Sequence, residues 1–337
     1  MNRRFRNSGL ILTGFAVVAF ATLAQAHHSS APYNLDEEVV VAGEIIEYTW
    51  AAPHVYIGIR DETGQNWIIE GNPPNVLARN GWSRDSLTMG EIISARANPS
   101  RDSQRSEVRL ISLIAEGGAS LQGLPGNQLI RDADENATTD TLDGVWRGNP
   151  GDAFGNTGWN DVPLTPKGQA AKDSYVEEIE DPTLECVAYN TPRTLRLNAF
   201  YLSEFEVMEE RILLRNEFGN IERTIYMDGR THPENGERTN QGYSVGHWED
   251  DVLVVDTRLF SSNRDPGTKG IPSGHQKRVI ERFEIADSGR QLTVHVSATD
   301  PEFLQAPFVA SYDWFYSPHL QLDGFDCDTE TAGRYVH

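Results

Sequence analysis

The chain has 337 residues, 38% of them hydrophobic, which is enough for two domains that each have a core. It carries 50 acidic and 29 basic residues, a formal net charge of -21 at pH 7. Such a surface repels phosphate backbones and anionic lipid heads, so the charge argues against nucleic-acid binding and polybasic membrane binding. The acidic excess indicates solubility and identifies no cationic ligand.

The first 26 residues are organised like a secretory signal peptide. Three arginines precede an apolar run over Gly9 to Thr22, and Ala24-Gln25-Ala26 supplies a cleavage site. A membrane anchor is less favoured, because the run is shorter than the ~20 residues that span a bilayer. Cleavage removes three arginines and no acidic residue, so the charge moves from -21 to -24. We expect a periplasmic or secreted product that begins at His27 and has no further membrane span.

Cys186 and Cys327 are the two cysteines of the chain. An exported chain meets an oxidising compartment, so we expect a disulfide between them. A catalytic thiol is the alternative, but it prefers basic neighbours. Here Glu185 precedes the first cysteine, and Asp326 and Asp328 flank the second.

Residues 27–115 alternate apolar and polar residues in short runs, which predicts a β-rich domain. The predicted strands are Glu37 to Tyr48, His54 to Arg60, Asn66 to Glu70, Glu91 to Ala97 and Glu107 to Ala115. A short helix is predicted over Pro73 to Arg79, since Pro stands at its start and Gly81 just past its end. This order is typical of a five-stranded barrel of the oligonucleotide/oligosaccharide-binding (OB) type, although it also suits other small barrels.

Residues 116–140 are rich in glycine and polar residues and predict a linker. Residues 141–337 then predict a larger β-domain with one helical segment, Pro163 to Glu180, capped by Thr165. Its first predicted strand starts with Gly144-Val145-Trp146. The later ones are Thr194 to Leu197, Glu204 to Val207, Arg211 to Glu217, Ile221 to Tyr226, Tyr243 to Trp248, Val252 to Thr257, Gln276 to Ala286, Gln291 to Thr299 and Val309 to Tyr316.

The strands over residues 221–257 are expected to form an antiparallel meander. Eight or more strands with one helix predict an up-and-down antiparallel barrel, which is wide enough to hold one small ligand. The triplet Gly144-Val145-Trp146 resembles the lipocalin signature, in which the Trp closes one end of such a barrel.

Two stretches resemble known groups of proteins. Residues 27 to about 115 resemble a family of exported bacterial proteins of unknown function, through His27-His28-Ser29, Gly43-Glu44-Ile45, Trp50, Pro53-His54-Val55, Gly81-Trp82 and Asp85-Ser86-Leu87. In that family Asn usually stands where this chain has Ala52. Residues 141–337 are similar to a second uncharacterised, lipocalin-like exported group, through Pro163-Leu164-Thr165-Pro166, Asp181-Pro182, Ile225 to Pro233 and Gly242 to Glu249. The resemblances imply architecture and export, and no activity.

The new N-terminus is a candidate copper site. After cleavage, His27 offers an α-amine beside its imidazole, and His54 could complete a planar set of three nitrogen ligands that suits Cu(II). His28 is an alternative, because a His in second position can chelate through amine, amide and imidazole. The competing interpretation is two exposed histidines after a signal site, with His54 hydrogen-bonded near Trp50. Metal analysis of the processed protein decides between them.

Four residues are candidate catalytic groups. Ser244 lies in Gly242-x-Ser244-x-Gly246, the pattern of serine hydrolases, which requires a strand-turn-helix elbow. The sequence after it alternates like a strand, so a bent barrel strand is favoured. His232, His247 and Asp256 are candidate acid/base groups if they face a common cavity. The alternative for each histidine is a structural or exposed side chain.

Five aromatic residues are candidate ligand-binding residues: Trp146, Tyr226, Trp248, Tyr312 and Trp314. A lining of aromatic side chains can bind flat apolar ligands or sugars. The alternative is that these rings fill the barrel core and plug one end.

Three hypotheses follow for the function. The first is an exported binding protein for a small apolar or amphipathic molecule, with the candidate copper site at its N-terminus. The second is a cofactor-independent periplasmic enzyme of isomerase, dehydratase or hydrolase type that uses His and acidic residues in the barrel cavity. The third is a copper-handling protein. An apolar cavity favours the first, and convergent titratable groups inside it favour the second.

Overall fold

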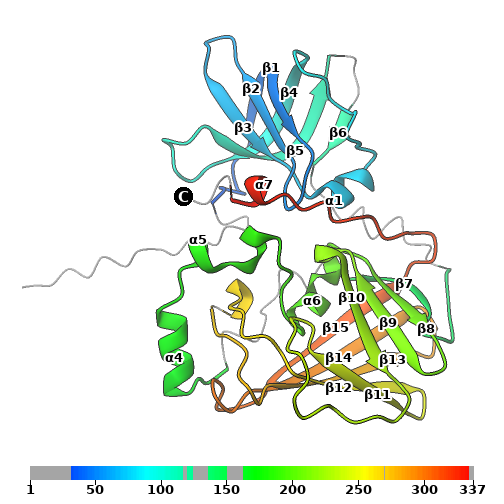
Figure 1. Cartoon of the computed structure of the whole chain (residues 1–337). Coiled ribbons are helices and arrows are strands. Elements are labelled where there is room, and N and C mark those ends of the chain that lie inside the picture. The colour runs from blue at the N-terminus through cyan, green and yellow to red at the C-terminus, as the bar shows by residue number, and fades with distance from the viewer. Residues whose placement is uncertain (1–31, 117–119, 124–135, 150–161, 269, 334–337) are drawn as a thin grey trace, which may run out of the picture.

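The computed structural model describes residues 32–116, 120–123, 136–149, 162–268 and 270–333. The fold is mainly β and consists of two barrels, as predicted (Figure 1). The predicted signal peptide, with His27 and His28 after it, lies outside the described residues. Within those residues, no helix has both the length and the apolar character to cross a bilayer.

The first barrel follows the predicted order of elements. It contains β1 (Val39–Thr49), β2 (Tyr56–Arg60), β3 (Asn66–Glu70), α1 (Pro74–Ala78), β4 (Ile92–Pro99), β5 (Glu107–Ala115) and β6 (Ser120–Gln122). The strands are ordered β3-β2-β1-β4-β5-β6, and a parallel pairing of β3 with β5 closes β1 to β5 into a barrel. Strand β6, which was not predicted, adds to β5 at the edge.

The second barrel has nine strands that follow one another around its circumference. They are β7 (Gly144–Gly148), β8 (Ser203–Val207), β9 (Arg211–Asn216), β10 (Ile221–Tyr226), β11 (Tyr243–Glu249), β12 (Val252–Arg258), β13 (Arg278–Ile285), β14 (Gln291–Thr299) and β15 (Phe308–Tyr316). Strand β15 pairs with β7 and closes the barrel. The prediction of a larger antiparallel lipocalin-like barrel is therefore confirmed, except that one pair of strands is parallel.

One pairing in this barrel differs from the predicted meander. Strands β10 and β11 run parallel, with Ile225 opposite Ser244 and Tyr226 opposite Val245. The long connection over residues 227–242 returns the chain to the end at which β10 began. Strand β11 therefore starts from that end and runs in the same direction.

The helical segments also differ from the prediction. The single helix expected over residues 163–180 is divided into α4 (Pro166–Asp173) and α5 (Glu177–Glu180), with Thr165 capping α4 as predicted. The strand expected over residues 194–197 is wrong, because α6 (Arg193–Arg196) occupies this position after Pro192. Thr194 and Leu195 are consecutive and both buried, a pattern that a one-sided strand does not give.

The interior of the second barrel is packed with side chains. Trp146, Phe205, Phe283 and Trp314 are almost fully buried and belong to one hydrophobic cluster that spans the barrel. The rings of Phe205 and Phe283 meet edge to face with centroids 5.3 Å apart. These rings occupy the space in which a lipocalin-like carrier would hold its ligand.

A buried ion pair completes this interior. Arg223 on β10 donates from Nη1 to Glu281 on β13 at 2.7 Å, and a second contact joins Nη2 to the same carboxylate. Ser244 accepts from Nε at 2.8 Å, and Thr257 accepts from Nη2 at 2.7 Å. Because every charged group here has a partner, the pair is tolerated inside the barrel.

The C-terminal segment, residues 317–333, links the two barrels. It leaves β15 and passes along the first barrel, where α7 (Thr329–Gly333) lies (Figure 1). The Ala52 amide donates to the Asp326 carbonyl at 2.9 Å, and the Asp328 amide donates to the Ala52 carbonyl at 3.2 Å. The predicted disulfide between Cys186 and Cys327 is present, with the two Cα atoms 5.8 Å apart.

Glu217 is a buried carboxylate at the contact between the barrels. Arg79, just after α1 of the first barrel, donates to both Glu217 oxygens, at 2.7 and 3.0 Å. Asn75 in α1 adds a bond at 2.9 Å. The backbone amides of Leu202 and Asp323 also donate to Glu217, each at 2.9 Å. One side chain therefore joins the first barrel, the second barrel and the C-terminal segment.

Candidate functional site

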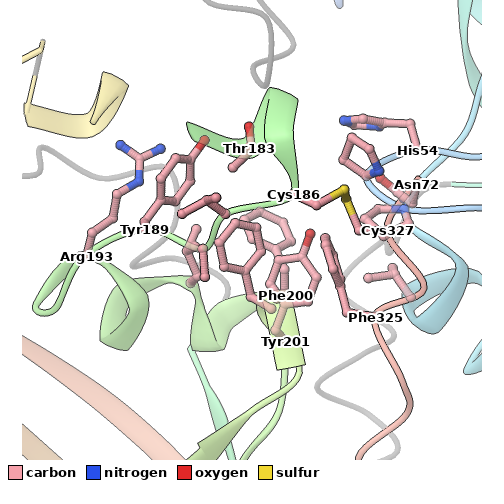
Figure 2. Close-up of a pocket in the computed structure, with 18 of the residues that line it drawn as sticks. His54, Asn72, Thr183, Cys186, Tyr189, Arg193, Phe200, Tyr201, Phe325 and Cys327 are labelled. Atoms are coloured by element: carbon pink, nitrogen blue, oxygen red, sulfur yellow. A yellow bond between two sulfur atoms is a disulfide. The ribbon is translucent and has the colours of Figure 1, made fainter. Parts of the chain in front are cut away.

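An apolar cavity of about 140 Å³ lies where the two barrels meet (Figure 2). The first barrel contributes His54, Asn72 and Val76 to its wall. The second barrel contributes mainly the segment between η2 (Pro182–Glu185) and β8, and the C-terminal segment contributes Phe325. The Cys186–Cys327 disulfide is itself part of the wall.

Aromatic rings form one side of the cavity. Phe218 stacks on Tyr189 with centroids 5.1 Å apart and meets Tyr201 at 5.2 Å and Phe325 at 5.3 Å. Figure 2 shows Tyr201 and Phe325 side by side below the disulfide. Burial is the largest of the effects that raise the pKa values of Tyr189 and Tyr201, so both phenols stay protonated at neutral pH.

The opposite side, on the first barrel, is polar. His54 Nδ1 lies 3.0 Å from the Gly71 carbonyl and 3.2 Å from Glu70, contacts that require a proton on Nδ1. Glu70 also accepts from Arg109 at 3.3 Å, and Arg109 donates to the Asn72 side-chain oxygen at 3.1 Å. The polar groups on this side are therefore held in fixed orientations around one carboxylate.

A small polar chamber of about 20 Å³ adjoins the cavity, and Arg193 lines both. In it the buried Lys277 amine donates to the Thr191 carbonyl at 3.0 Å and to Ser273 Oγ at 2.9 Å. Arg193 pairs with Asp265 at 2.7 Å. A chamber of this size holds one or two water molecules, so we interpret these contacts as structural.

The stability of the protein should depend on pH through Lys277. Burial lowers its pKa to about 8, although Asp300 and Asp265 oppose the shift. The unfolded chain, with a pKa near 10.5, then binds more protons, so stability rises between pH 8 and 10.5. Urea unfolding gives the free energy of unfolding of wild type and of Lys277→Met at pH 7 and at pH 10. The difference between the two proteins should shift in favour of wild type by about 2–3 kcal/mol from pH 7 to pH 10. If the difference in stability between wild type and Lys277→Met does not change with pH, Lys277 does not have a lowered pKa.

The four candidate catalytic residues do not meet in one site. Ser244 lies inside the second barrel, bonded to Arg223, in a strand rather than an elbow. His232 and Asp256 lie on the barrel exterior, where His232 Nε2 is 3.0 Å from the Asp256 carbonyl oxygen. The Asp256 carboxylate pairs with Arg258 and Arg278, which contribute to a lowered pKa although burial opposes the shift. His247 is 62% exposed beside Glu249.

The five aromatic candidates also lie away from the cavity between the barrels. Trp146, Tyr312 and Trp314 belong to the core of the second barrel, which matches the alternative interpretation of these rings. Tyr226 stacks on Tyr243 outside that core, with centroids 5.0 Å apart. Trp248 is 46% exposed at the end of β11.

Of the candidate metal ligands, His54 alone falls within the described residues, and it lines the cavity. The proton on Nδ1 would leave Nε2 as its ligand atom. The ranges that the structure covers hold no group of three or more His, Cys, Asp or Glu side chains suited to a metal ion. The copper site stays a prediction, because His27 and His28 lie outside these ranges.

Sequence reasoning missed the aromatic residues that line the cavity: Tyr189, Phe200, Tyr201, Phe218 and Phe325. One available signal was the disulfide. A bond between Cys186 and Cys327 must place Tyr189 and Phe325, each within three residues of a cysteine, near one another.

Fold and cavity together define a two-barrel protein with an apolar, aromatic-lined cavity at its domain interface. Residues 16–109 match a family of unknown function, DUF6152, so the N-terminal part of the chain is similar to that family. The comparison with curated proteins gave no match. The resemblance of residues 141–337 to a second exported group stays a prediction.

Proposed function

We propose that this chain is an exported binding protein that holds a small apolar or amphipathic molecule in the cavity between its barrels. The cavity itself carries the proposal, since it combines an aromatic wall with a few oriented polar groups. Ligand sites in proteins have this composition and often lie at domain interfaces. The site therefore differs from the predicted one, which lay inside the second barrel.

The volume limits the size of the ligand. A dry apolar cavity of roughly 150 Å³ accepts benzene or xenon, so a cavity of about 140 Å³ accommodates one aromatic ring or a similar apolar group. Both barrels and the C-terminal segment contribute to its wall, so the ligand would contact all three. Binding should therefore stabilise the association of the barrels.

Export rests on the N-terminal sequence and on the disulfide. The first 26 residues have the pattern of a signal peptide, and a structural disulfide persists in oxidising compartments. A periplasmic or secreted location is thus part of the proposal.

A cavity-filling substitution tests the proposal. Val187 lines the cavity outside the regular strands, so Val187→Phe should place a ring in the ligand space. We expect calorimetry to show toluene binding to the wild type, weakened about tenfold or more in the variant. Val309→Phe, which adds the same ring on the exposed face of β15, is the matched control and should bind toluene like the wild type. Equal toluene affinity in Val187→Phe and wild type would contradict this location.

Within the described residues, the candidate groups of the two other hypotheses do not meet in one site. The enzyme hypothesis needs convergent groups, whereas Ser244 faces the barrel interior and His247 faces solvent. The copper hypothesis depends on residues outside those ranges. Native mass spectrometry of the processed protein from its own compartment would show a copper ion or a bound small molecule directly.

A further inference from the structure

Tyr201 presents an unusual group to the cavity. The side chain is 7% exposed, and its ring packs against Phe218 and Phe325 with centroids 5.2 and 5.8 Å apart. Its hydroxyl makes no hydrogen bond to any described residue. In Figure 2 this oxygen points toward the disulfide end of the cavity. Because the rest of the side chain is buried, the partner that such a hydroxyl normally has must come from the cavity, as water or as a polar group of a ligand.

Three other polar side chains near the cavity have partners, whereas Arg193 pairs with Asp265 through Nη1 and leaves its Nε unpaired within the described residues. The Tyr189 hydroxyl donates to Asp181 at 3.3 Å, and the Tyr33 hydroxyl donates to Glu70 at 2.6 Å. Asn72 accepts from Arg109 and donates to the Gly123 carbonyl. The Tyr201 hydroxyl therefore differs from these three side chains and defines the polar end of the ligand space.

The surroundings of Tyr201 favour a neutral ligand group. Burial is the main cause of its raised pKa, and Glu217 raises it further, so the phenol keeps its proton. A charged ligand would lose its hydration in this apolar cavity, at a cost that a neutral hydroxyl partner does not recover. A ligand hydroxyl can both donate to and accept from a tyrosine hydroxyl.

We infer that the cavity takes a small neutral phenol, with its ring among the aromatic side chains and its hydroxyl bonded to Tyr201. The inference rests on the proposed function, because it names the ligand class of the same site. The aromatic wall of the cavity favours a ligand with an aromatic ring, and the cavity volume limits that ligand to a single ring. The Tyr201 hydroxyl, which has no partner in the described residues, favours a ligand with one polar group.

Calorimetry with phenol and toluene on wild type and Tyr201→Phe tests this inference. The substitution should weaken phenol binding about three- to tenfold, the typical value of one net hydrogen bond, and leave toluene binding unchanged. Tyr226→Phe, outside the cavity, is the matched control and should change neither affinity. Unchanged toluene binding also shows that the Tyr201→Phe cavity is intact.

The outcomes separate this inference from the proposed function. If wild type binds neither compound, the proposed function fails. If toluene binds but Tyr201→Phe leaves phenol affinity unchanged, the ligand class is wrong and the proposed function stands. A crystal structure of wild type with phenol gives a second readout. We expect the phenol oxygen about 2.7–2.8 Å from the Tyr201 oxygen, and a ring in the reversed orientation would overturn the inference.

Discussion

Replacing Glu217 by alanine should lower the free energy of unfolding by about 3–5 kcal/mol, because the substitution leaves a partly buried charge without its partner. Arg79 would lose its bidentate acceptor in a contact where its side chain is 12% exposed. Asn75 and the amides of Leu202 and Asp323 would lose the same acceptor. Urea unfolding measures this loss, and the variant should also bind toluene more weakly, because the barrels are less firmly joined.

A second glutamate provides the matched control. Glu222 pairs with Arg215 at 3.0 Å on the surface, and its side chain is 56% exposed. Exposed ion pairs contribute little, so Glu222→Ala should change stability by less than about 1 kcal/mol. If Glu217→Ala is as stable as Glu222→Ala, or more stable, then the contact between the barrels does not depend on the Glu217 carboxylate.

Removing the disulfide should have an effect of similar size. The bond closes a loop with a sequence separation of 141, so Cys186→Ser combined with Cys327→Ser should cost about 2–5 kcal/mol. Both cysteines line the cavity, and the bond holds the C-terminal segment that carries Phe325. Thermal unfolding and toluene calorimetry on the double variant should therefore show a lower Tm and a weaker affinity.

Reduction provides the control for this variant. A reducing agent strong enough to open the bond should destabilise the wild type to the level of the double variant and leave the double variant unchanged. Equal stability of oxidised wild type and double variant would contradict a structural role for the bond.

The first barrel was predictable because its signals are local. Strand alternation, turn residues and the Pro73-to-Gly81 helix boundaries each depend on neighbours in sequence. The parallel pairing of β10 with β11 was missed because the direction of β11 depends on the path of residues 227–242, which has no periodic pattern. The helix α6 was missed because Thr194 to Leu197 is too short to show a period.

The site was harder to predict than the fold. Alternation along β7 and β15 indicates that Trp146 and Trp314 point inward, but it does not say whether the interior is hollow or filled. That outcome depends on the summed volumes of side chains from nine strands. The cavity itself combines His54, Tyr201 and Phe325, which are far apart in sequence. The sequence predicts a role for three of its residues, namely His54 as a metal ligand and the two cysteines as a disulfide.

A crystal structure under xenon pressure would test most directly where this protein binds apolar molecules. Xenon enters dry apolar cavities of this size and scatters strongly enough to be located without a bound organic ligand. We predict a xenon site between the barrels, beside Tyr201 and Phe325. Xenon inside the second barrel, or no xenon between the barrels, would contradict our proposal that apolar molecules bind in this cavity.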